Sequence, residues 1–524
     1  MSSVPAPLQC SFPVNRRAFL LGGAAFAAAA ILPVRARGTV ARLSAYPFTL
    51  GVASGDPAAD GFVLWTRLAP RPLELGGGMS PAAVEVVWEV ATDEGMTRIV
   101  RRGAASASPD WAHSVHVEVE GLEPDRWYWY RFMAGGEVSP MGRTRTLPTA
   151  GAQPERLRFA FASCQKYEVG YYTAYEHMAR EELDLIVFLG DYIYEKTDGS
   201  DAVRPHGLPE ALTLDDYRRR YAVYKTDSSL QAAHSMAPWL VTWDDHEVSN
   251  DYAGSVPENP GAADPARFLL RRAAAYRAYY EHMPLRHAAR PSGPDLRLYR
   301  RFDYGQLARF NVLDTRQYRT DQPAGPRLQP DRPDLRDPAG TLLGLDQLAW
   351  LFEGLDQSPA RWNVLAQQVL MAPVDRVPGP DKVVDVDKWA GYEFERRRVL
   401  RHFLEKNISN PVVLTGDKHN NWANELLIDF DDSVERPAAV EFLGTSITSG
   451  GDGVDQPDYT AALLAENPCV KYHNNERGYV RCEITKKYWR SDFRTIPYVT
   501  RRGAPLQTRA SFVVESGAPR LHQA

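Results

Sequence analysis

Short, predominantly apolar runs recur between residues 157 and 415, and they restrict the possible folds more than any other feature of this sequence. They cover residues 157–162, 184–189, 239–242, 307–312, 363–366 and 411–415. Amphipathic helical patterns at 171–183, 265–282 and 391–406 separate some of these runs. Apolar strands that alternate with helices form sheets covered on both faces. We therefore predict a layered α/β domain over residues 155 to 515.

The preceding residues, 45 to 150, have a different pattern, which is typical of a small antiparallel β-sandwich. Runs rich in β-branched and aromatic residues occur at 61–66 and 84–90, and residues 115–119 alternate between apolar and polar side chains. Leu122, Pro124 and Tyr128 follow with a spacing that resembles the tyrosine corner of fibronectin-type sandwiches. We predict a β-sandwich domain at 45–150, a linker at 149–154 and a long surface loop at 319–340.

The length and charge of the chain limit its class. The chain has 524 residues, of which 44% are hydrophobic and 24% are charged. This length allows two or three domains, and the composition supports a large core that needs no disulfides. The net charge is −5; residues 1 to 37 hold four Arg and no acid, so the remainder has 57 basic and 66 acidic residues. That acidic balance does not support a role in coating nucleic acid or binding a membrane surface.

The first 37 residues have the features of a cleaved signal peptide. Arg16 and Arg17 precede Phe19, Leu20 and an Ala- and Gly-rich apolar run that ends at Pro33. A basic start, a short apolar core and a small-residue exit are typical of an export signal, and the Arg pair resembles a twin-arginine signal. We expect the twin-arginine machinery to export the chain to the periplasm or the extracellular space. The alternative is a retained N-terminal anchor, although the run is short for a membrane span.

The cysteines leave at least one thiol without a disulfide partner. Cys10 would be removed with the signal peptide, so Cys164, Cys469 and Cys482 remain. An odd number of thiols is informative in an oxidising compartment. Cys469 and Cys482 lie thirteen residues apart across a predicted turn, and they can either pair or stay free. If they pair, Cys164 is the single free thiol.

Polar side chains of metal-binding types directly follow four of the predicted strands. Because loops beyond the carboxyl ends of strands converge on the functional crevice of layered α/β folds, we expect these side chains to meet. Carboxylate and amide oxygens suit calcium, magnesium or manganese, whereas thiolate, imidazole and phenolate groups suit iron or zinc. The four segments are Ser163-Cys164-Gln165, Gly190-Asp191-Tyr192-Ile193-Tyr194-Glu195, Asp244-Asp245-His246-Glu247-Val248-Ser249-Asn250-Asp251-Tyr252 and Gly416-Asp417-Lys418-His419-Asn420-Asn421-Trp422.

Each of these side chains also has an ordinary structural interpretation. Cys164 is a small side chain of a type that proteins often bury, and Asp191 follows a glycine as in many turns. Tyr194 can pack with its hydroxyl at the rim of the core, and His419 can be a hydrogen-bonded core histidine. The acidic residues near 245 can form a solvated cap. Four apolar strands that all end in ligand-type side chains favour a metal site over these separate explanations.

The same segments resemble those of a known family. Gly190-Asp191-x-x-Tyr194 matches the Gly-Asp-x-x-Tyr motif of purple acid phosphatases, in which Asp bridges two metals and Tyr binds ferric iron. The larger ordered set is similar to that of PhoD-type alkaline phosphatases and phosphodiesterases. One departure is visible, because members often carry small polar residues after the final His, where this chain has Asn420 and Asn421. The set comprises residues 48–56, 161–165, 191–195, 244–247, 313–317, 366–368 and 415–419.

The resemblance implies a particular fold and metal content. It implies an N-terminal fibronectin- or immunoglobulin-like β-sandwich, followed by a four-layer metallophosphoesterase domain in which two sheets are flanked by helices. It also implies one ferric ion with calcium ions nearby. Carried onto this sequence, Cys164 and Tyr194 would bind iron, Asp191 would bridge iron and calcium, and Asn250 would bind calcium.

The remaining implied residues complete the cluster and the chemistry. Asp417 and His419 would also bind metal, without assignment to one ion. A hydroxide or oxide held by the metals would attack phosphorus in line, so no phosphoenzyme is expected. His246 and Asp191 would be catalytic, with His246 donating to a phosphate oxygen or to the leaving group.

The implied substrates are phosphate mono- and diesters. They include small phosphate esters and phospholipid, nucleotide or teichoic-type phosphodiesters, and no stable binding of nucleic acid is expected. Two alternatives stay open: a phospholipase D-like phosphodiesterase of the same fold, and a non-catalytic binding protein that contains metal. A catalytic metal site keeps an open position, and the number of polar strand-end loops favours such an open crevice.

Overall fold

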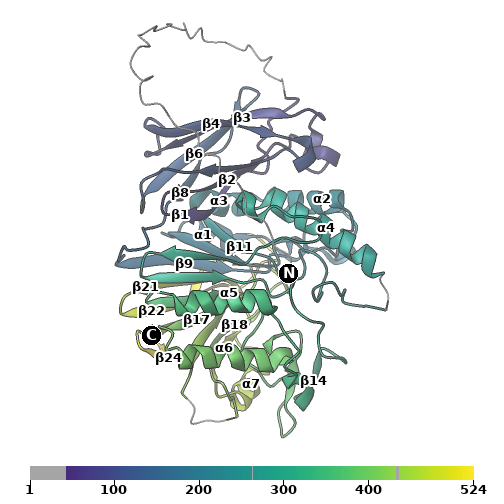
Figure 1. The fold of residues 1–524 in the computed structure, drawn as a ribbon. Coiled ribbons are helices and arrows are strands. Elements are labelled where there is room, and N and C mark those ends of the chain that lie inside the picture. Colours follow the sequence, from purple (N-terminus) through teal and green to yellow (C-terminus); the bar gives the residue numbers. More distant parts are fainter. Residues whose placement is uncertain (1–42, 262–263, 432–435) are drawn as a thin grey trace, which may run out of the picture. The chain divides into compact units, whose positions relative to one another are not determined.

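The computed structural model describes residues 43–261, 264–431 and 436–524, which belong to one compact unit. This unit is an α/β fold with several sheets and comparatively few helices (Figure 1). The signal peptide predicted at residues 1 to 37, and Cys10 within it, lie outside the described residues. Within the described ranges, no helix combines the length and apolarity needed to cross a bilayer.

The largest sheet has ten strands and contains the first three apolar runs predicted from the sequence. Its central strands β9, β10 and β11 are parallel and hydrogen-bonded in adjacent register. On one side of them β21 pairs antiparallel with β9, and on the other side β1 pairs parallel with β11. The spatial order is β24 (Ala518–Gln523), β23 (Gln507–Glu515), β22 (Tyr488–Ile496), β21 (Arg477–Thr485), β9 (Arg156–Ala162), β10 (Leu185–Leu189), β11 (Trp239–Thr242), β1 (Val52–Ala58), β2 (Gly61–Arg67) and β5 (Ser114–Val119).

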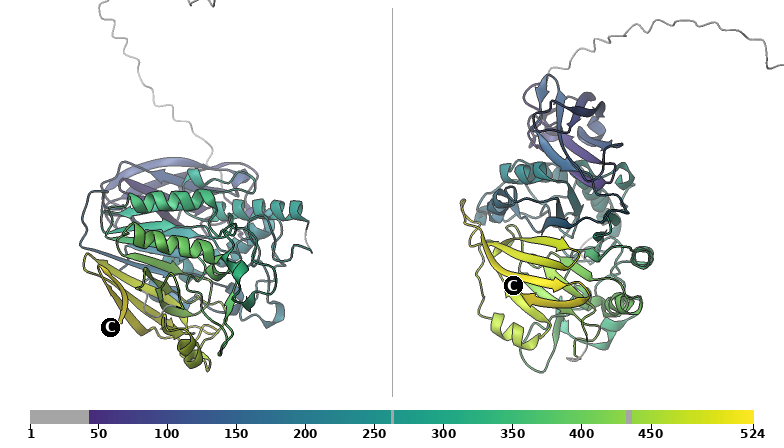
Figure 2. Two further views of the ribbon diagram at one scale, coloured as in Figure 1. Left: turned by 60° about the horizontal axis from the view of Figure 1, so that its bottom comes forward. Right: turned by 90° about the vertical axis from the view of Figure 1, so that its left-hand side faces the viewer.

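A second sheet has seven strands and contains the other three apolar runs. Strands β13, β15, β17 and β19 are parallel neighbours, and the strands outside them are antiparallel. Figure 2 shows the C-terminal strands of the chain in yellow, next to the green strands of this sheet. The spatial order is β12 (Arg300–Tyr304), β13 (Ala308–Val312), β15 (Trp362–Ala366), β17 (Pro411–Thr415), β19 (Ala439–Leu443), β18 (Asn421–Leu426) and β20 (Val470–Asn474).

The N-terminal strands are divided between two sheets. Strands β1, β2 and β5 extend the ten-stranded sheet, and a five-stranded antiparallel sheet packs against them through a shared apolar core. The Tyr128 hydroxyl lies 3.2 Å from the Glu123 carbonyl oxygen, as the predicted corner requires. Strand β1 pairs with β11, so one sheet contains strands from both sides of the boundary predicted near residue 150. That boundary remains a prediction. The five-stranded sheet contains β4 (Ile99–Ala107), β3 (Val84–Ala91), β6 (Trp127–Ala134), β7 (Glu137–Val138) and β8 (Gly142–Arg145).

Alternating side chains of the central strands enter two different cores. Phe159 and Phe161 pack toward the seven-stranded sheet, whereas Ala160 and Ala162 pack toward α1 to α4. The opposite face of the seven-stranded sheet packs against α5 and α6. Strands with both faces covered must be apolar throughout, which explains the runs in the sequence. The helices are α1 (Thr173–Met178), α2 (Leu214–Lys225), α3 (Ser228–Met236), α4 (Pro265–His282), α5 (Leu345–Asp356), α6 (Glu393–Glu405) and α7 (Thr460–Glu466).

Several local predictions can be compared with this structure. The helix predicted at 265–282 is confirmed, and Asp264 caps its first turn before Pro265. The helix predicted at 171–183 ends early, at Met178. The loop predicted at 319–340 contains a short strand, β14 (Leu328–Pro330), which pairs with β16 (Val383–Asp385). Cys469 and Cys482 are free thiols in different core clusters, so they do not form the disulfide that the sequence left open.

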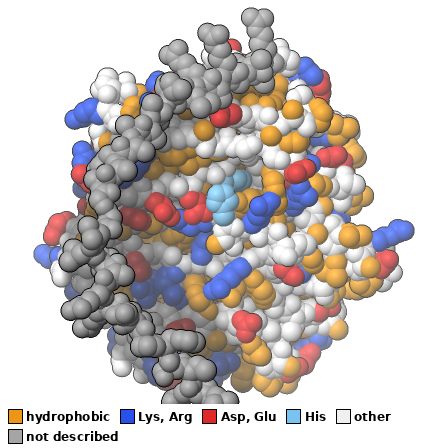
Figure 3. Space-filling model, turned by 45° about the horizontal axis from the view of Figure 1, so that its top comes forward, with side chains coloured by type: hydrophobic (Ala, Val, Ile, Leu, Met, Phe, Trp, Pro, Cys, Tyr) orange, Lys and Arg blue, Asp and Glu red, His pale blue; other side chains and the backbone are white. Residues whose placement is uncertain are grey.

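On the face shown in Figure 3, hydrophobic, acidic and basic side chains of the described residues are intermixed.

Candidate metal centre

Four loops meet at one edge of the two sheets, as the sequence predicts. Ala162 pairs with Phe188 and Leu189 pairs with Thr242, so β9, β10 and β11 end side by side. Strand β17 of the seven-stranded sheet contributes the fourth loop. Its Gly416 approaches Ser163 so closely that an added Cβ would lie 2.8 Å from the Ser163 Cβ atom.

A second glycine permits an equally close approach between two loops. Gly190 follows β10 with φ of +107°, and a Cβ there would lie 2.6 Å from both the backbone nitrogen and the Cβ of Asp244. Glycine is therefore required before Asp191 for two reasons, the positive φ and the absence of a side chain. The two glycines place the Gly-Asp segments after β10 and β17 directly against the neighbouring loops.

The predicted ligands themselves have an unusual backbone. Cys164, Asp191, Asp417 and His419 have φ values of +57°, +57°, +62° and +57°. Non-glycine residues rarely adopt this left-handed conformation, which costs free energy and concentrates at functional sites. Each loop therefore turns sharply at the residue whose side chain is a candidate ligand.

The first group of candidate ligands contains Cys164, Asp191 and His419. Their ligand atoms all lie within 4.8 Å of one another. Tyr194 joins this group, because its hydroxyl is 2.9 Å from Asp191 Oδ2 and 3.2 Å from His419 Nε2. Ser449 donates a hydrogen bond of 2.7 Å to the same hydroxyl. The structure thus brings together four of the six metal ligands predicted from the sequence.

The second group contains Asp191, Asp245 and His246, again with ligand atoms within 4.8 Å. Asp191 is common to both groups, which is the position expected of a bridging carboxylate. Glu195 is fully buried, and its Oε2 atom lies 2.7 Å from Nδ1 of His246. The imidazole also packs on the Tyr194 ring, with centroids 4.1 Å apart.

The other two predicted ligands lie on loops that reach the same edge but contact other partners. Asn250 donates a hydrogen bond of 2.7 Å to Glu258 through its side-chain amide. Asp417 Oδ2 is 2.5 Å from Lys388 Nζ, and Asp417 Oδ1 is 3.9 Å from Arg316. In this structure Asp417 therefore forms an ion pair with a buried lysine.

A buried network of charges adjoins the second group and was not predicted from the sequence. Arg316 is completely buried, with its guanidinium 2.5 Å from Asp244 and hydrogen-bonded twice to Asp387 at 2.9 and 3.0 Å. Lys388 Nζ also lies 3.0 Å from Asp387. Arg316 belongs to the 313–317 segment of the family resemblance, but no sequence pattern distinguished Lys388 or Asp387.

Further residues of the quoted segments have structural roles that sequence reasoning did not assign. Glu247 is fully buried and accepts hydrogen bonds from the backbone amides of Asp191, Tyr192 and Asp244. It thereby ties the loop after β10 to the loop after β11. The only indication of this role in the sequence was that Glu247 directly follows His246 in the segment after β11.

The ionisation of these groups follows from burial and from their neighbours. Burial and the adjacent Asp191 raise the pKa of the Cys164 thiol well above its ordinary value. Burial lowers the pKa of His419 to about 3, so its imidazole is neutral, the form that binds metal. Burial disfavours a charged His246, but Glu195 and Asp191 outweigh this and hold its pKa well above its ordinary value.

The donor set fits bound cations. Asp244 Oδ2 is buried and has no hydrogen-bond donor among the described residues. Burial followed by the neighbouring carboxylates raises the pKa of Asp191 well above its ordinary value, although His246 opposes the shift. A carboxylate cluster of this kind needs positive charge to ionise. Thiol, phenol and imidazole groups beside it suit a transition metal, whereas carboxylates and an amide suit a hard cation.

Comparison with known proteins identifies the family. The model of the PhoD-like phosphatase family matches residues 159–493, and that of the PhoD-like phosphatase N-terminal domain matches residues 34–148. The chain is a PhoD-like phosphatase. The first match covers the strands and loops that carry all six predicted ligands.

Two similar proteins support the assignment of this chain to the PhoD-like phosphatase family. Alkaline phosphatase D of Bacillus subtilis is 53% identical over 477 residues, which are 90% of this chain and 81% of that protein. A solved structure of PhoD has 52% sequence identity and a TM-score of 0.89, and the match covers 92% of each chain. The family resemblance predicted from the sequence is confirmed, and the chain is a phosphatase. A non-catalytic binding protein is therefore the wrong interpretation.

Proposed function

We propose that this PhoD-like phosphatase is a metal-dependent hydrolase of phosphate mono- and diesters. The observation that carries the proposal is the position of Asp191, whose carboxylate belongs to both groups of candidate ligands. A shared carboxylate is suited to bridge two cations, and paired cations neutralise charge on a phosphoryl group. The predicted four-layer arrangement, preceded by an N-terminal immunoglobulin-like β-sandwich, belongs to the same proposal.

We assign the two kinds of metal by ligand chemistry. Cys164, Tyr194 and His419 would hold a ferric ion, because thiolate, phenolate and imidazole suit iron. Asp191 would bridge this ion to calcium, for which Asp245 of the second group, together with Asn250 and Asp417, would supply oxygen ligands. For Asp417 this assignment requires calcium to displace the Lys388 ammonium, which lies 2.5 Å from its carboxylate.

The residues of the chain have separate tasks in the proposed reaction. Cations bound here would supply Lewis acidity toward a phosphoryl group and a water molecule. His246 would donate a proton or hydrogen bond to a phosphate oxygen or to the leaving group. Glu195 engages His246 Nδ1 at 2.7 Å, which fixes the ring and leaves Nε2 available for the substrate. The Ser449 hydroxyl beside Tyr194 is hydrogen-bonded to that phenol and to the Cys164 carbonyl oxygen, so in this proposal water rather than a side-chain hydroxyl attacks and no phosphoenzyme forms.

A pair of cysteine variants tests the metal assignment. Cys164→Ala should lose iron, the broad visible absorption expected of a tyrosinate bound to ferric iron, and hydrolysis of a chromogenic monoester. Cys482→Ala is the matched control, because Cys482 is also a fully buried free thiol but lies in the apolar core. Full iron content and activity in Cys164→Ala would show that Cys164 only packs.

Substrate class and export need separate measurements. Turnover of a chromogenic monoester and a chromogenic diester by the iron- and calcium-loaded enzyme compares the proposal with the phospholipase D-like alternative. Turnover of diesters alone would favour that alternative. We further propose export by the twin-arginine machinery, supported by Arg16 and Arg17. Replacing both arginines with lysine should retain the chain in the cytoplasm, and unchanged export would contradict this route.

A further inference from the structure

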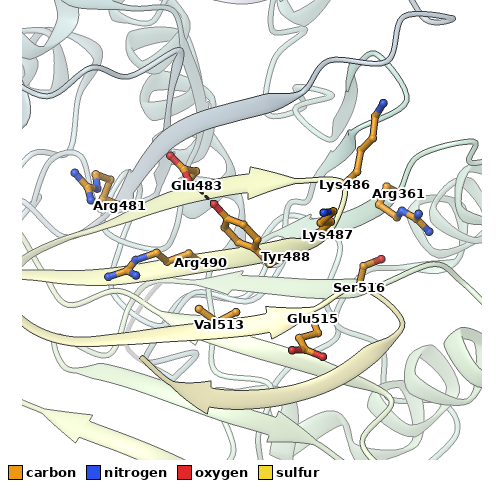
Figure 4. A pocket seen from close by; sticks show the side chains of 10 residues that line it. All are labelled: Arg361, Arg481, Glu483, Lys486, Lys487, Tyr488, Arg490, Val513, Glu515 and Ser516. Atoms are coloured by element: carbon orange, nitrogen blue, oxygen red, sulfur yellow. Dashed lines mark hydrogen bonds between the residues drawn. The ribbon is translucent and has the colours of Figure 1, made fainter.

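A broad groove lies on the outer face of the C-terminal strands, away from the candidate metal centre. Its volume is about 800 Å³. Figure 4 shows the side chains of β21, β22 and β23 that line it, together with the turn between β21 and β22. The lining residues are Arg361, Arg481, Glu483, Lys486, Lys487, Tyr488, Arg490, Val513, Glu515 and Ser516.

Strand alternation explains why charged side chains gather on this face. Cys482, Ile484 and Trp489 point inward and are fully buried in the core between the two large sheets. Glu483 lies between Cys482 and Ile484, and Arg490 follows Trp489. These two residues pair across β21 and β22 and therefore share the outer face. The turn adds Lys486 and Lys487 at the end of the same face.

The charges of the groove are unbalanced toward positive. It is lined by five cationic side chains and two carboxylates. Three of the cations, Arg481, Lys486 and Arg490, form ion pairs with carboxylates outside the lining. Glu483 is already engaged, because Arg158 lies 2.8 Å from it and the Tyr488 hydroxyl donates to it at 2.8 Å. Among the described residues, Arg361 and Lys487 have no carboxylate within ion-pair distance, and both are exposed. Two cations are thus directed to solvent without a partner.

The groove is separated from the metal centre by the length of a strand. Thr485, at the groove end of β21, pairs with Arg156 at the beginning of β9. The candidate ligand Cys164 follows the opposite end of β9, beyond Ala162. At about 3.3 Å per residue, strand β9 spans roughly 20 Å. A single phosphate group therefore cannot contact both places, whereas a longer chain can.

We propose that this groove binds a polyanion that carries several phosphate groups. Arginine presents a planar fork of donors that matches phosphate oxygens, and lysine adds a mobile point charge. The volume and open form of the groove suit several linked phosphates better than one. Its position makes it a binding site separate from the catalytic groups, so the inference goes beyond the proposed function.

Direct binding measurements test this site. Fluorescence anisotropy of labelled inorganic polyphosphate is measured with the metal-loaded full-length enzyme, in excess orthophosphate to occupy single-phosphate sites. The test variant is Arg361→Glu with Lys487→Glu, which changes the lining to three cations and four carboxylates. The matched control is Arg102→Glu with Arg267→Glu, because both are exposed arginines without an ion pair among the described residues and neither lines the groove.

The two variants carry the same net charge change, so they separate a site from diffuse attraction. Wild type and control should bind polyphosphate with affinity that falls as salt rises, and the groove variant should bind at least about tenfold more weakly. Turnover of a chromogenic monoester should be equal in all three. Absence of binding in wild type, equal weakening in both variants, or full binding in the groove variant would each overturn the proposal. Failure of the metal assignment would instead appear in the Cys164→Ala experiment.

Discussion

Replacing Gly190 with alanine tests how the loops of the candidate metal centre are held together. The new Cβ would lie 2.6 Å from the backbone nitrogen and the Cβ of Asp244, and 2.8 Å from the Trp243 carbonyl carbon. These atoms belong to or adjoin the backbone, so they cannot rotate away as the end of a flexible side chain can. The loop after β10 must separate from the loop after β11, and Asp191 must move away from Asp245 and His246.

Two contributions set the expected magnitude. Holding alanine at φ of +107° costs about 1–3 kcal/mol. Relieving the overlap with Asp244 costs about a further 1–3 kcal/mol. The free energy of unfolding should therefore fall by about 2–6 kcal/mol. Gly503→Ala isolates the first contribution, because Gly503 has φ of +81° but its Cβ would have no atom within 4 Å.

Urea unfolding followed by tryptophan fluorescence measures both variants, and metal analysis is done on the same samples. Gly190→Ala should unfold at lower urea than Gly503→Ala and should bind less metal, whereas Gly503→Ala should keep the metal content of wild type. If the two variants differ by less than about 0.5 kcal/mol, the close approach of the loops does not restrain them. The argument for glycine at position 190 would then reduce to backbone conformation alone.

Three further predictions concern acid stability, positioning and buried charge. Burial lowers the pKa of His116 to about 4, below its value in the unfolded chain, so its contribution to stability is complete above about pH 6.5 and is lost as pH falls toward 4. His116→Gln should therefore reduce the loss of stability between these pH values in urea unfolding by roughly 3 kcal/mol, and an unchanged pH dependence would contradict this. Glu195→Gln should lower kcat about 10- to 100-fold with little change in KM, because the His246 ring loses its charged partner; an unchanged kcat and pH profile would show that Glu195 does not position the ring. Arg316→Met should lower the free energy of unfolding by about 3–5 kcal/mol, because it leaves buried carboxylates without a partner; an unchanged urea midpoint would contradict that role.

The central strands could be predicted because both of their faces are covered. Each of β9, β10, β11, β13, β15 and β17 coincides within a residue or two with an apolar run. The convergence of the strand-end loops could be predicted for a related reason, since Cys164, Asp191 and His419 follow such strands. A local pattern was sufficient here, because the carboxyl ends of parallel strands must meet.

Elements that depend on tertiary contacts could not be predicted in this way. Helices α2, α3 and α5 gave no expectation from their sequence patterns; α2 is rich in charged residues and is held by packing on the large sheet. Lys388 enters the charge network from a loop, with no periodic pattern around it. The disulfide possibility between Cys469 and Cys482 rested on spacing alone, and the two thiols face different cores.

The pairing of β1 with β11 has a consequence for dividing this chain. The sequence suggests a cut near residue 150, but β1, β2 and β5 continue the sheet that contains β9, β10 and β11. Arg286 and Arg300 add ion pairs of 3.1 and 2.7 Å to Glu118 and Asp56 across the same boundary. A fragment that begins after residue 150 would leave the backbone edge of β11 bare, and bare strand edges recruit other chains. The segments before and after residue 150 should therefore be expressed together, and neither should be replaced without the other.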